Sequence, residues 1–216
     1  MQYNSFKYIY PQLPKKSTSG KHLDNFDNGE YVLQPNYEGE VCTVFTNGFE
    51  LMVYDHRGKI LKNVSNTIDF RRMALSKNWF VYTGLYCNKY RNVEMAFEQD
   101  RFIITDVLVW DGEYLVGTTL LERLSLLDHA FKFNVTMISD CFVETFKFLY
   151  CTEIIGVFRA RVYHSHFVSL FEQMNKAAYD GVVLRKKETQ LQDSMRSRNN
   201  RQDNILCRNR ISFFNF

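Results

Sequence analysis

The sequence predicts an α+β fold, in which antiparallel β-sheets are flanked by helices. The predicted elements follow one another as strands, a helix, strands, a second helix and further strands. Aromatic residues make up 16% of the chain, with 19 Phe and 13 Tyr, and their side chains suit the half-buried surface of a sheet. We therefore assign most of these rings to a β-rich core, and regard stacking on nucleic-acid bases as the less favoured alternative.

The first half of the chain is predicted to consist mainly of strands. Residues 1–29 are expected to be irregular, because prolines, glycines and polar residues follow one another closely. Turns are expected at Asn47–Gly48, Arg57–Gly58 and Asp111–Gly112. A helix is expected over residues 66–78. Strands are expected over residues 30–36, 40–47, 49–55 and 79–87, and on both sides of the last turn within 101–117.

Two segments have the apolar spacing of amphipathic helices. The first covers residues 118–131, with Thr118 as its expected cap and with Glu122 and Arg123 expected to face outward. Its apolar positions are Leu120, Leu121, Leu124, Leu127 and Ala130. The second covers residues 165–180, and its apolar face is formed by Phe167, Leu170, Phe171 and Met174. We expect both helices to pack on sheets.

The remainder of the second half is predicted to contain strands and one basic loop. Residues 132–163 contain further strands, and "YDGVVLRKK" is a turn that leads into a buried strand. Residues 189–204 are polar and are expected to form a mobile loop, before a last strand in 205–216. Between residues 185 and 210, eight basic residues stand against three acidic ones, a net charge of +5. This segment is either a solvated loop or an arm that contacts phosphates. We expect residues 30–216 to form one domain.

Composition excludes several classes of protein. Net charge is only +3, and no apolar run approaches the ~18 residues of a membrane span. The N-terminal residues lack the apolar block of a signal peptide. Five dispersed cysteines, without a C-x-x-C pair, fit reduced thiols in a cytoplasm. His164 and His166 are close in sequence but lack further ligands, so no metal site is expected from the residues themselves.

Four segments and a closing one occur in a recognisable order: "QPNYEG", "VYTGLY", "ITDVLVWDGEYLVGTTLLERLSLL", "YDGVVLRKK" and "ILCRNR". Together they resemble the adenylyltransferase domain of ATP-dependent polynucleotide ligases, and most of all the short phage DNA and RNA ligases. The likeness covers nearly the whole chain. It implies a ligase-type nucleotidyltransferase core that is ATP-grasp-like, without a separate OB domain. It also implies a monomer in the cytoplasm, or in the host cytoplasm if a phage encodes the protein.

The resemblance implies a specific chemistry. In this family, a lysine in a K-x-(D/N)-G loop attacks the α-phosphate of ATP and becomes a lysyl-adenylate, which requires a neutral amine. Carboxylates position Mg²⁺ and the ribose, and basic residues offset charge on the leaving pyrophosphate. AMP then passes to a 5′-phosphate of DNA or RNA, and a 3′-hydroxyl displaces it. ATP, Mg²⁺ and a nucleic acid are therefore the implied cofactors and partner.

The nucleophile loop of the family falls on Asn36–Tyr37–Glu38–Gly39. Gly39 is kept, but Asn36 stands at the lysine position and Glu38 at the position of Asp or Asn. An amide nitrogen is delocalised into its carbonyl and cannot act as an amine nucleophile. The resemblance places Gln34 near the adenine.

The other motifs are kept in part. The (D/N)-G-E strand falls on Thr83–Gly84–Leu85, so Leu85 replaces the catalytic glutamate. Asp106 fits the next motif, although Thr105 replaces the usual aromatic residue before it; Phe102 is then a candidate for base stacking, with core packing as the favoured alternative. The resemblance assigns Asp180 a catalytic role, as the acidic residue of the fourth motif. The remaining candidates for the nucleotide site are Gly181, Arg185 or Lys186, Leu206 at a lysine position, and Arg208.

Three hypotheses follow from these departures. In the first, the chain keeps the fold but is catalytically impaired or inactive, and binds nucleotide or nucleic acid through Arg185, Lys186, Arg208 and the basic residues of 196–201. In the second, it is an active ligase that uses Lys59 or Lys62 as a substitute nucleophile. In the third, it is a non-enzymatic interaction protein whose former phosphate site is filled by Leu85 and Leu206. We favour the first hypothesis.

Overall fold

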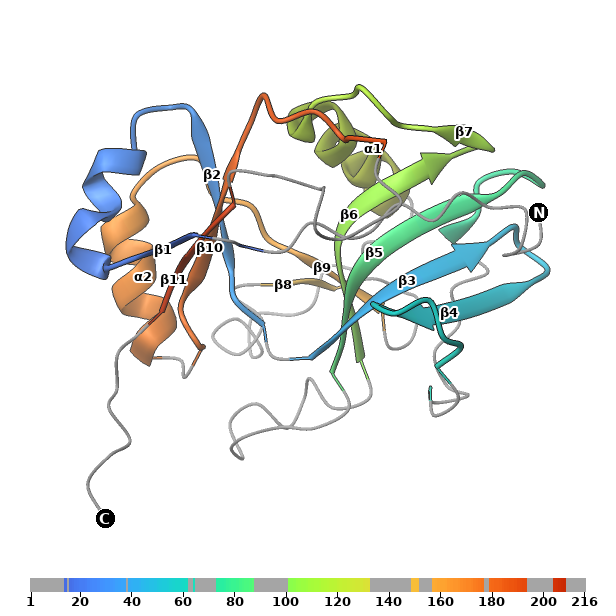
Figure 1. The fold of residues 1–216 in the computed structure, drawn as a ribbon, viewed down its shortest axis with the longest axis horizontal. Helices are drawn as coiled ribbons and strands as arrows, with labels where there is room; N and C mark the ends of the chain where they lie inside the picture. The colour runs from blue at the N-terminus through green and yellow to red at the C-terminus, as the bar shows by residue number, and fades with distance from the viewer. Residues whose placement is uncertain are drawn as a thin grey trace, which may run out of the picture.

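A computed structural model of the chain describes residues 14, 16–37, 39–61, 64, 73–87, 101–132, 149–151, 157–176, 179–193 and 204–208. The described residues form two β-sheets side by side, with helices on their outer faces (Figure 1). The predicted α+β class is confirmed. Most strand pairs are antiparallel, but two pairs, β1 with β11 and β6 with β9, are parallel.

The large sheet has the strand order β4-β3-β5-β6-β9-β8, and β7 pairs with β6 off this path. Its strands are β3 (Glu40–Thr46), β4 (Leu51–Asp55), β5 (Phe80–Cys87), β6 (Arg101–Trp110), β7 (Glu113–Tyr114), β8 (Leu149–Cys151) and β9 (Val157–Ala160). The predicted turns connect its hairpins: Gly48 and Gly58 have positive φ, as do Asp111 (53°) and Gly112 (88°) between β6 and β7. Two consecutive residues of positive φ are what a tight two-residue hairpin needs.

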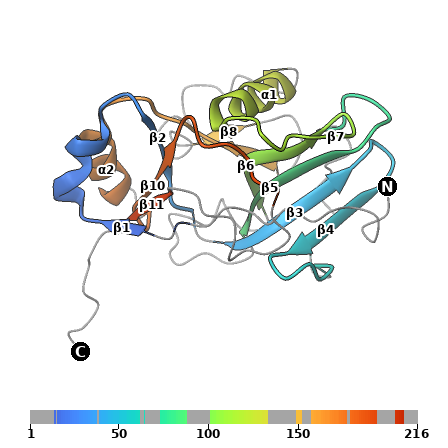
Figure 2. The ribbon, with the colours of Figure 1, turned by 45° about the horizontal axis from the view of Figure 1, so that its top comes forward.

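The small sheet has the order β1-β11-β10-β2. Its strands are β1 (Lys16–Thr18), β2 (Tyr31–Pro35), β10 (Val182–Lys186) and β11 (Ile205–Cys207). Helix α2 (Phe167–Lys176) and the 3₁₀-helix η2 (Gly20–Phe26) cover its outer face (Figure 2). Residues 16–26 were expected to be irregular, but they contain β1 and η2.

Helix α1 (Leu120–Lys132) packs against β6 of the large sheet. Its first turn is closed by a capping box, in which the Thr119 hydroxyl accepts from the Glu122 N–H (3.3 Å) and the Glu122 carboxylate accepts from the Thr119 N–H (2.6 Å). Thr119 is therefore the cap, and the prediction of Thr118 is wrong by one residue. Arg123 was predicted to face outward but is fully buried. Its position three residues after Leu120 places it on the apolar face of the helix.

Helix α2 begins with a cap from a distant part of the chain. The Asp27 carboxylate accepts from the backbone N–H groups of His166 (2.8 Å) and Phe167 (3.3 Å). A carboxylate at this end of a helix satisfies free N–H groups and interacts favourably with the helix dipole. This contact joins the segment that follows η2 to α2. Phe167, Phe171 and Met174 are buried as predicted.

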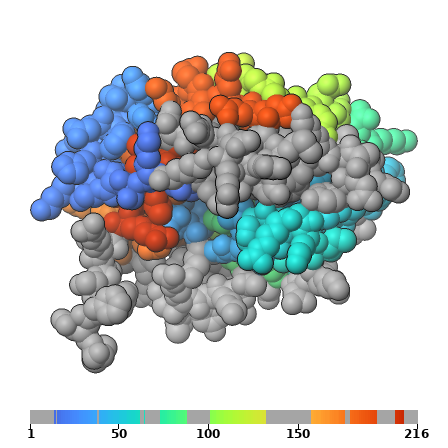
Figure 3. Space-filling model, in the orientation of Figure 1, coloured from blue at the N-terminus to red at the C-terminus, as the bar shows by residue number. Residues whose placement is uncertain are grey.

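The apolar core is divided between the two sheets. One cluster lies between the large sheet and α1, and includes Val44, Tyr82, Phe102, Leu124 and Leu127. A second joins the small sheet to η2 and α2, and includes Leu23, Leu33, Phe167, Met174 and Leu184. The edge strand β4 and the turn after it, teal in Figure 3, lie on the surface. The second cluster also includes Ile103 and Ala160 of the large sheet, so apolar contacts join the two sheets.

Three further expectations concern segments that the structure describes only in part. Of the helix expected over 66–78, residues 73–78 are not α-helical, and 66–72 lie outside the described residues. Of the loop expected over 189–204, residues 189–193 are anchored: Leu191 is buried, and its N–H donates to the Thr118 carbonyl (2.9 Å). Residues 194–203 lie outside the description. The helices of the described chain are too short or too polar to cross a membrane.

Candidate functional site

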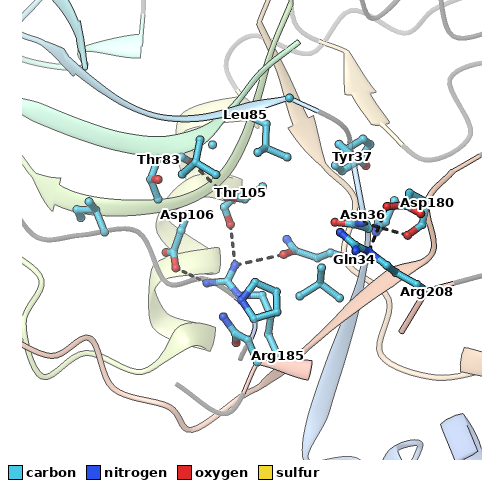
Figure 4. Close-up of a pocket in the computed structure, with 18 residues that line it drawn as sticks. Gln34, Asn36, Tyr37, Thr83, Leu85, Thr105, Asp106, Asp180, Arg185 and Arg208 are labelled. Atoms are coloured by element: carbon cyan, nitrogen blue, oxygen red, sulfur yellow. Dashed lines mark hydrogen bonds and ion pairs between the residues drawn. The ribbon is translucent and has the colours of Figure 1, made fainter. Parts of the chain in front are cut away.

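A cavity of about 310 Å³ lies between the two sheets (Figure 4). The small sheet contributes residues from β2 and β10 and the residues on either side of β11, and the large sheet contributes residues from β3, β5 and β6. The lining residues used below are Gln34, Asn36, Thr83, Leu85, Thr105, Asp106, Asp180, Val183, Arg185 and Arg208. Sequence segments far apart in the chain, including most of the predicted motif positions, therefore meet in one place.

The segment after β2 places Asn36 at the pocket wall. The Asn36 backbone N–H donates to the Gly181 carbonyl (2.9 Å) and continues the pairing of β2 with β10. The Asn36 side-chain amide donates to the Asp180 carbonyl (3.0 Å) and lies 3.5 Å from the Asp180 carboxylate. Asn36 is thus held on both main chain and side chain by the 180–181 turn. Glu38, which was predicted to belong to the same loop, lies outside the described residues.

Asp180 connects Asn36 to the last strand. Its carboxylate lies 3.3 Å from the Arg208 guanidinium, whose side chain is 63% exposed. Gly181 follows with φ of 90°, and a Cβ at this position would collide with the Cys207 carbonyl oxygen. Only glycine fits here, since both the backbone angle and the closeness of β11 exclude a side chain.

We expect Gly181→Ala to lower the free energy of unfolding more than Gly117→Ala does. Gly117 has φ of 88°, but a methyl group added there would meet no atom within 4 Å, so its alanine variant reports backbone strain alone, about 1–3 kcal/mol. Gly181→Ala adds a steric clash with β11, about 1–3 kcal/mol more. Urea unfolding of both variants measures the difference. Equal losses would show that β10 and β11 separate easily at this point.

A buried ion cluster lies on the opposite side of the pocket. The Asp106 carboxylate accepts from Arg123 (2.9 and 3.1 Å) and from Arg185, and all three side chains are less than 10% exposed. Burial alone would raise the pKa of Asp106, but the charges and hydrogen bonds of Arg123 and Arg185 outweigh burial and hold that pKa below its ordinary value. Asp106 is therefore an ionised structural centre that joins α1, β6 and β10.

Arg185 links this cluster to Gln34. Besides Asp106, its guanidinium donates to the Thr105 carbonyl (2.9 Å) and to the Gln34 side-chain oxygen (3.2 Å). Figure 4 shows these contacts as dashed lines converging on Arg185. The Gln34 side-chain nitrogen is buried and has no hydrogen-bond partner among the described residues. A buried unpaired donor is costly, so it marks a position where a ligand atom can be accepted.

The β5 side of the pocket is apolar where the resemblance led us to expect a carboxylate. Leu85 lines the cavity, and Gly84 before it leaves room for β6, since a Cβ there would collide with the Ile103 carbonyl oxygen. The hydroxyls of Thr83 and Thr105 donate to backbone carbonyls of neighbouring strands, at 3.2 and 3.3 Å. This wall therefore offers little charge to a ligand.

Four predicted site residues that the structure describes are not among the lining residues: Gly181, Phe102, Lys186 and Leu206. Phe102 is fully buried and stacks on Tyr86, with ring centroids 5.2 Å apart, so it packs in the core. Lys186 points to the other face of β10 from Arg185 and lies 3.7 Å from the Glu30 carboxylate. Leu206 is not among the lining residues, although it pairs with Val183, which is. The basic residues of 196–201 lie outside the described part of the chain.

Sequence reasoning missed Arg123 as a member of the site. Its charge predicts a surface position, yet its spacing from Leu120 and Leu127 places it on the buried face of α1. A charged residue on the apolar face of a helix, together with Asp106 in the middle of an apolar strand, was the signal for a buried ion pair.

The described residues do not fit a protein-held Mg²⁺. They contain no group of three His, Cys, Asp or Glu side chains placed to hold a metal ion. Both Asp106 oxygens are engaged by arginines, Asp180 faces Arg208, and an apolar side chain, Leu85, lines the cavity where the resemblance led us to expect a glutamate. The cavity and the unpaired Gln34 nitrogen instead fit an organic ligand with a hydrogen-bond acceptor.

No protein-family model matches the sequence, and no curated protein matches it either. Solved structures do match. The ligase domain of LigD from M. tuberculosis superposes with a TM-score of 0.65 at 15% identity, over 94% of this chain and 60% of that one. The ATP-dependent DNA ligase from bacteriophage T7, in complex with ATP, has a TM-score of 0.55 at 11% identity, over 95% and 69%. Chlorella virus DNA ligase-adenylate has a TM-score of 0.54 at 10% identity, over 93% and 68%.

These matches establish the fold. The chain has the architecture of the nucleotidyltransferase domains of ATP-dependent DNA ligases, as the sequence motifs predicted. It spans about 60% of the length of the LigD chains that it matches.

Proposed function

We propose that this protein binds a nucleotide non-covalently in the pocket between its two sheets, and that it does not form a lysyl-adenylate. In this proposal the nucleotide site of a ligase-type fold is kept as a binding site, while strand joining by the chain itself is lost or severely impaired.

The observation that carries the proposal is the composition of the pocket wall. Asn36, which the resemblance assigns to the nucleophile position, lines the pocket, and none of the described lining residues is a lysine. Asn36 is also held by Asp180 and Gly181, so its side chain is already committed to hydrogen bonds within the protein. The lone pair of an amide nitrogen is delocalised into the carbonyl and is not free for attack on a phosphorus atom, and the described lining offers no lysine amine.

Three features of the pocket support nucleotide binding. Its volume falls in the range of small-molecule sites, which is about 300–1,000 Å³. The buried Gln34 nitrogen lacks a partner among the described residues and can donate to a base. Arg208 lines the cavity with most of its side chain exposed, so its guanidinium can meet phosphate oxygens in bidentate fashion. Arg185, by contrast, is committed to Asp106, Thr105 and Gln34.

The position of Lys59 argues against the second hypothesis, in which the chain is an active ligase with a substitute lysine. It is exposed in the turn after β4, where its backbone N–H donates to the Asp55 carboxylate (2.8 Å), and it is not among the lining residues. Lys62 lies outside the described residues. The third hypothesis requires a filled pocket, whereas the cavity beside Leu85 has space for a ligand.

Incubation with α-labelled ATP and Mg²⁺, followed by denaturing electrophoresis, tests the chemical half of the proposal. We expect no covalent label on the protein, and no sealing of a nicked duplex or of 5′-phosphorylated RNA. An acid-labile, alkali-stable AMP adduct would overturn the proposal. Calorimetric titration with nucleotides tests the binding half, and the absence of any binding would favour the third hypothesis.

Arg208→Ala is expected to weaken nucleotide binding by about tenfold, because hydrogen bonds to charged groups are among the stronger ones. The loss should be smaller at high salt, since Arg208 is exposed and its interaction with phosphate is screened. Arg57→Ala removes an exposed arginine outside the lining and is the matched control. Equal titration curves for Arg208→Ala and the parent protein would exclude Arg208 from the site.

A further inference from the structure

The orientation of the Gln34 amide is fixed by its neighbours. Gln34 lies on β2, is 4% exposed, and its side chain extends into the pocket (Figure 4). Its oxygen accepts from Arg185 at 3.2 Å. A guanidinium has only donors, so the reversed amide would place N–H against N–H. Arg185 cannot turn away easily, because Asp106 and the Thr105 carbonyl hold it as well.

This orientation leaves an unmet donor, the Gln34 nitrogen, in the inner part of the pocket. The Gln34 nitrogen presents N–H groups that have no acceptor among the described residues. The Arg185 guanidinium lies next to it. The Thr83 and Thr105 hydroxyls donate to backbone carbonyls. They therefore do not pair with the Gln34 nitrogen, and they add no further donor for a ligand. A ligand that fills this region is therefore best matched by an edge that carries acceptors.

Purine bases differ in this respect. Guanine presents two adjacent acceptors, N7 and O6, whereas adenine presents N7 beside the N6 amino donor. An amino group at this point would face the N–H groups of Gln34, while the Gln34 oxygen that could accept from it is already engaged by Arg185. An oxo group in the same place would accept from Gln34. The described wall thus discriminates between a 6-oxo and a 6-amino substituent.

We propose that the pocket selects nucleotides with a 6-oxopurine base over adenine nucleotides, with Gln34 as the residue that reads the base. This inference rests on the proposed function, since it names the class of nucleotide that the same site takes. It also separates this chain from the matched ligase structures that were solved with ATP.

Calorimetric titration with inosine 5′-monophosphate and AMP tests the proposal, because the two ligands share ribose and phosphate and differ only at the 6-position and the adjacent ring nitrogen. We expect the parent protein to bind the inosine nucleotide about tenfold more tightly than AMP, the effect of one unmet buried donor. GMP should behave like the inosine nucleotide. Gln34→Glu replaces the donor with an acceptor, keeps an oxygen for Arg185, and should reverse the preference.

The outcomes are distinguishable. Equal affinities, or tighter binding of AMP by the parent protein, would overturn the base assignment and leave the proposed nucleotide site in place. Failure of all three nucleotides to bind would overturn both. The comparison of ligands on the parent protein does not depend on the variant. Thermal unfolding of Gln34→Glu shows whether a reversed preference comes from a folded protein.

Discussion

Asp106→Asn is expected to lower the free energy of unfolding by about 3–5 kcal/mol, because it leaves Arg123 and Arg185 buried without a counter-charge. The variant has nearly the same shape, so the loss reports charge and hydrogen bonding and not a cavity. Arg123 also donates to the Thr118 carbonyl (2.6 Å), and Arg185 to Thr105, but these contacts supply no negative charge. Urea or thermal unfolding measures the effect.

Glu30→Gln is the matched control for this prediction. Glu30 faces Lys186 at 3.7 Å, and the two side chains are 59% and 39% exposed. An exposed pair of this kind contributes about 0–1 kcal/mol. If Asp106→Asn cost no more than Glu30→Gln, the arginines would have to be solvated, and the buried cluster would not be a structural centre.

The same cluster predicts a pH dependence of stability. The pKa of Asp106 is depressed in the folded protein, so its contribution is present above the unfolded-state value of about 3.9 and is lost as pH falls through the lower folded value. Unfolding measured between pH 7 and pH 3 should therefore show a steeper acid loss for the parent protein than for Asp106→Asn. Parallel curves for the two proteins would contradict the ionised state of Asp106.

The largest change in activity is expected from restoring three charges together, in Asn36→Lys, Leu85→Glu and Leu206→Lys. We expect this variant to acquire a covalent AMP label that the parent protein lacks, because it regains an amine at the pocket wall. Leu85 already lines the cavity. Leu206 pairs with Val183, so a lysine there would lie on the face of the sheet that borders the pocket. Labelling should increase with pH, since only the neutral amine attacks.

The control keeps the charge and removes the nucleophile. In the same background, Asn36→Arg carries a guanidinium that stays protonated and cannot attack. It should bind nucleotide without becoming labelled. Label on the arginine variant would show that another residue reacts, and no label on the lysine variant would show that the pocket no longer holds the α-phosphate near position 36.

Local sequence patterns predicted much of the fold, because the formation of a strand, a turn or a helix depends largely on residues that are close in sequence. Alternating apolar positions and glycine turns placed β2 to β7, and helical spacing placed α1 and α2. The caps were less predictable. Asp27 caps α2 through a contact across the chain, and no local signal marks such a pair. The parallel pairing of β1 with β11 likewise joins distant segments and left no pattern in the sequence.

Several motif positions meet in one pocket because they lie on, or directly beside, strands of the two sheets. Gln34, Asn36, Leu85, Asp180 and Arg208 all line the pocket, as their places in the motifs suggested. What motifs could not show is how side chains engage one another. Arg185 was predicted to meet a ligand but is bound to Asp106 and Gln34, and Arg123 from helix α1 donates to the same carboxylate.

The pairing of β1 with β11 also bears on the order in which the molecule assembles. Among β3 to β7, most pairs join strands that follow one another in the chain, so the hairpins of the large sheet can close early. The small sheet requires residues 16–18 to meet residues 205–207, a contact of very high sequence separation. Closure of that sheet is therefore expected to come late, after ribosomal synthesis has passed residue 207. Because the small sheet forms one wall of the pocket, a growing chain would have most of its core before it has a ligand site.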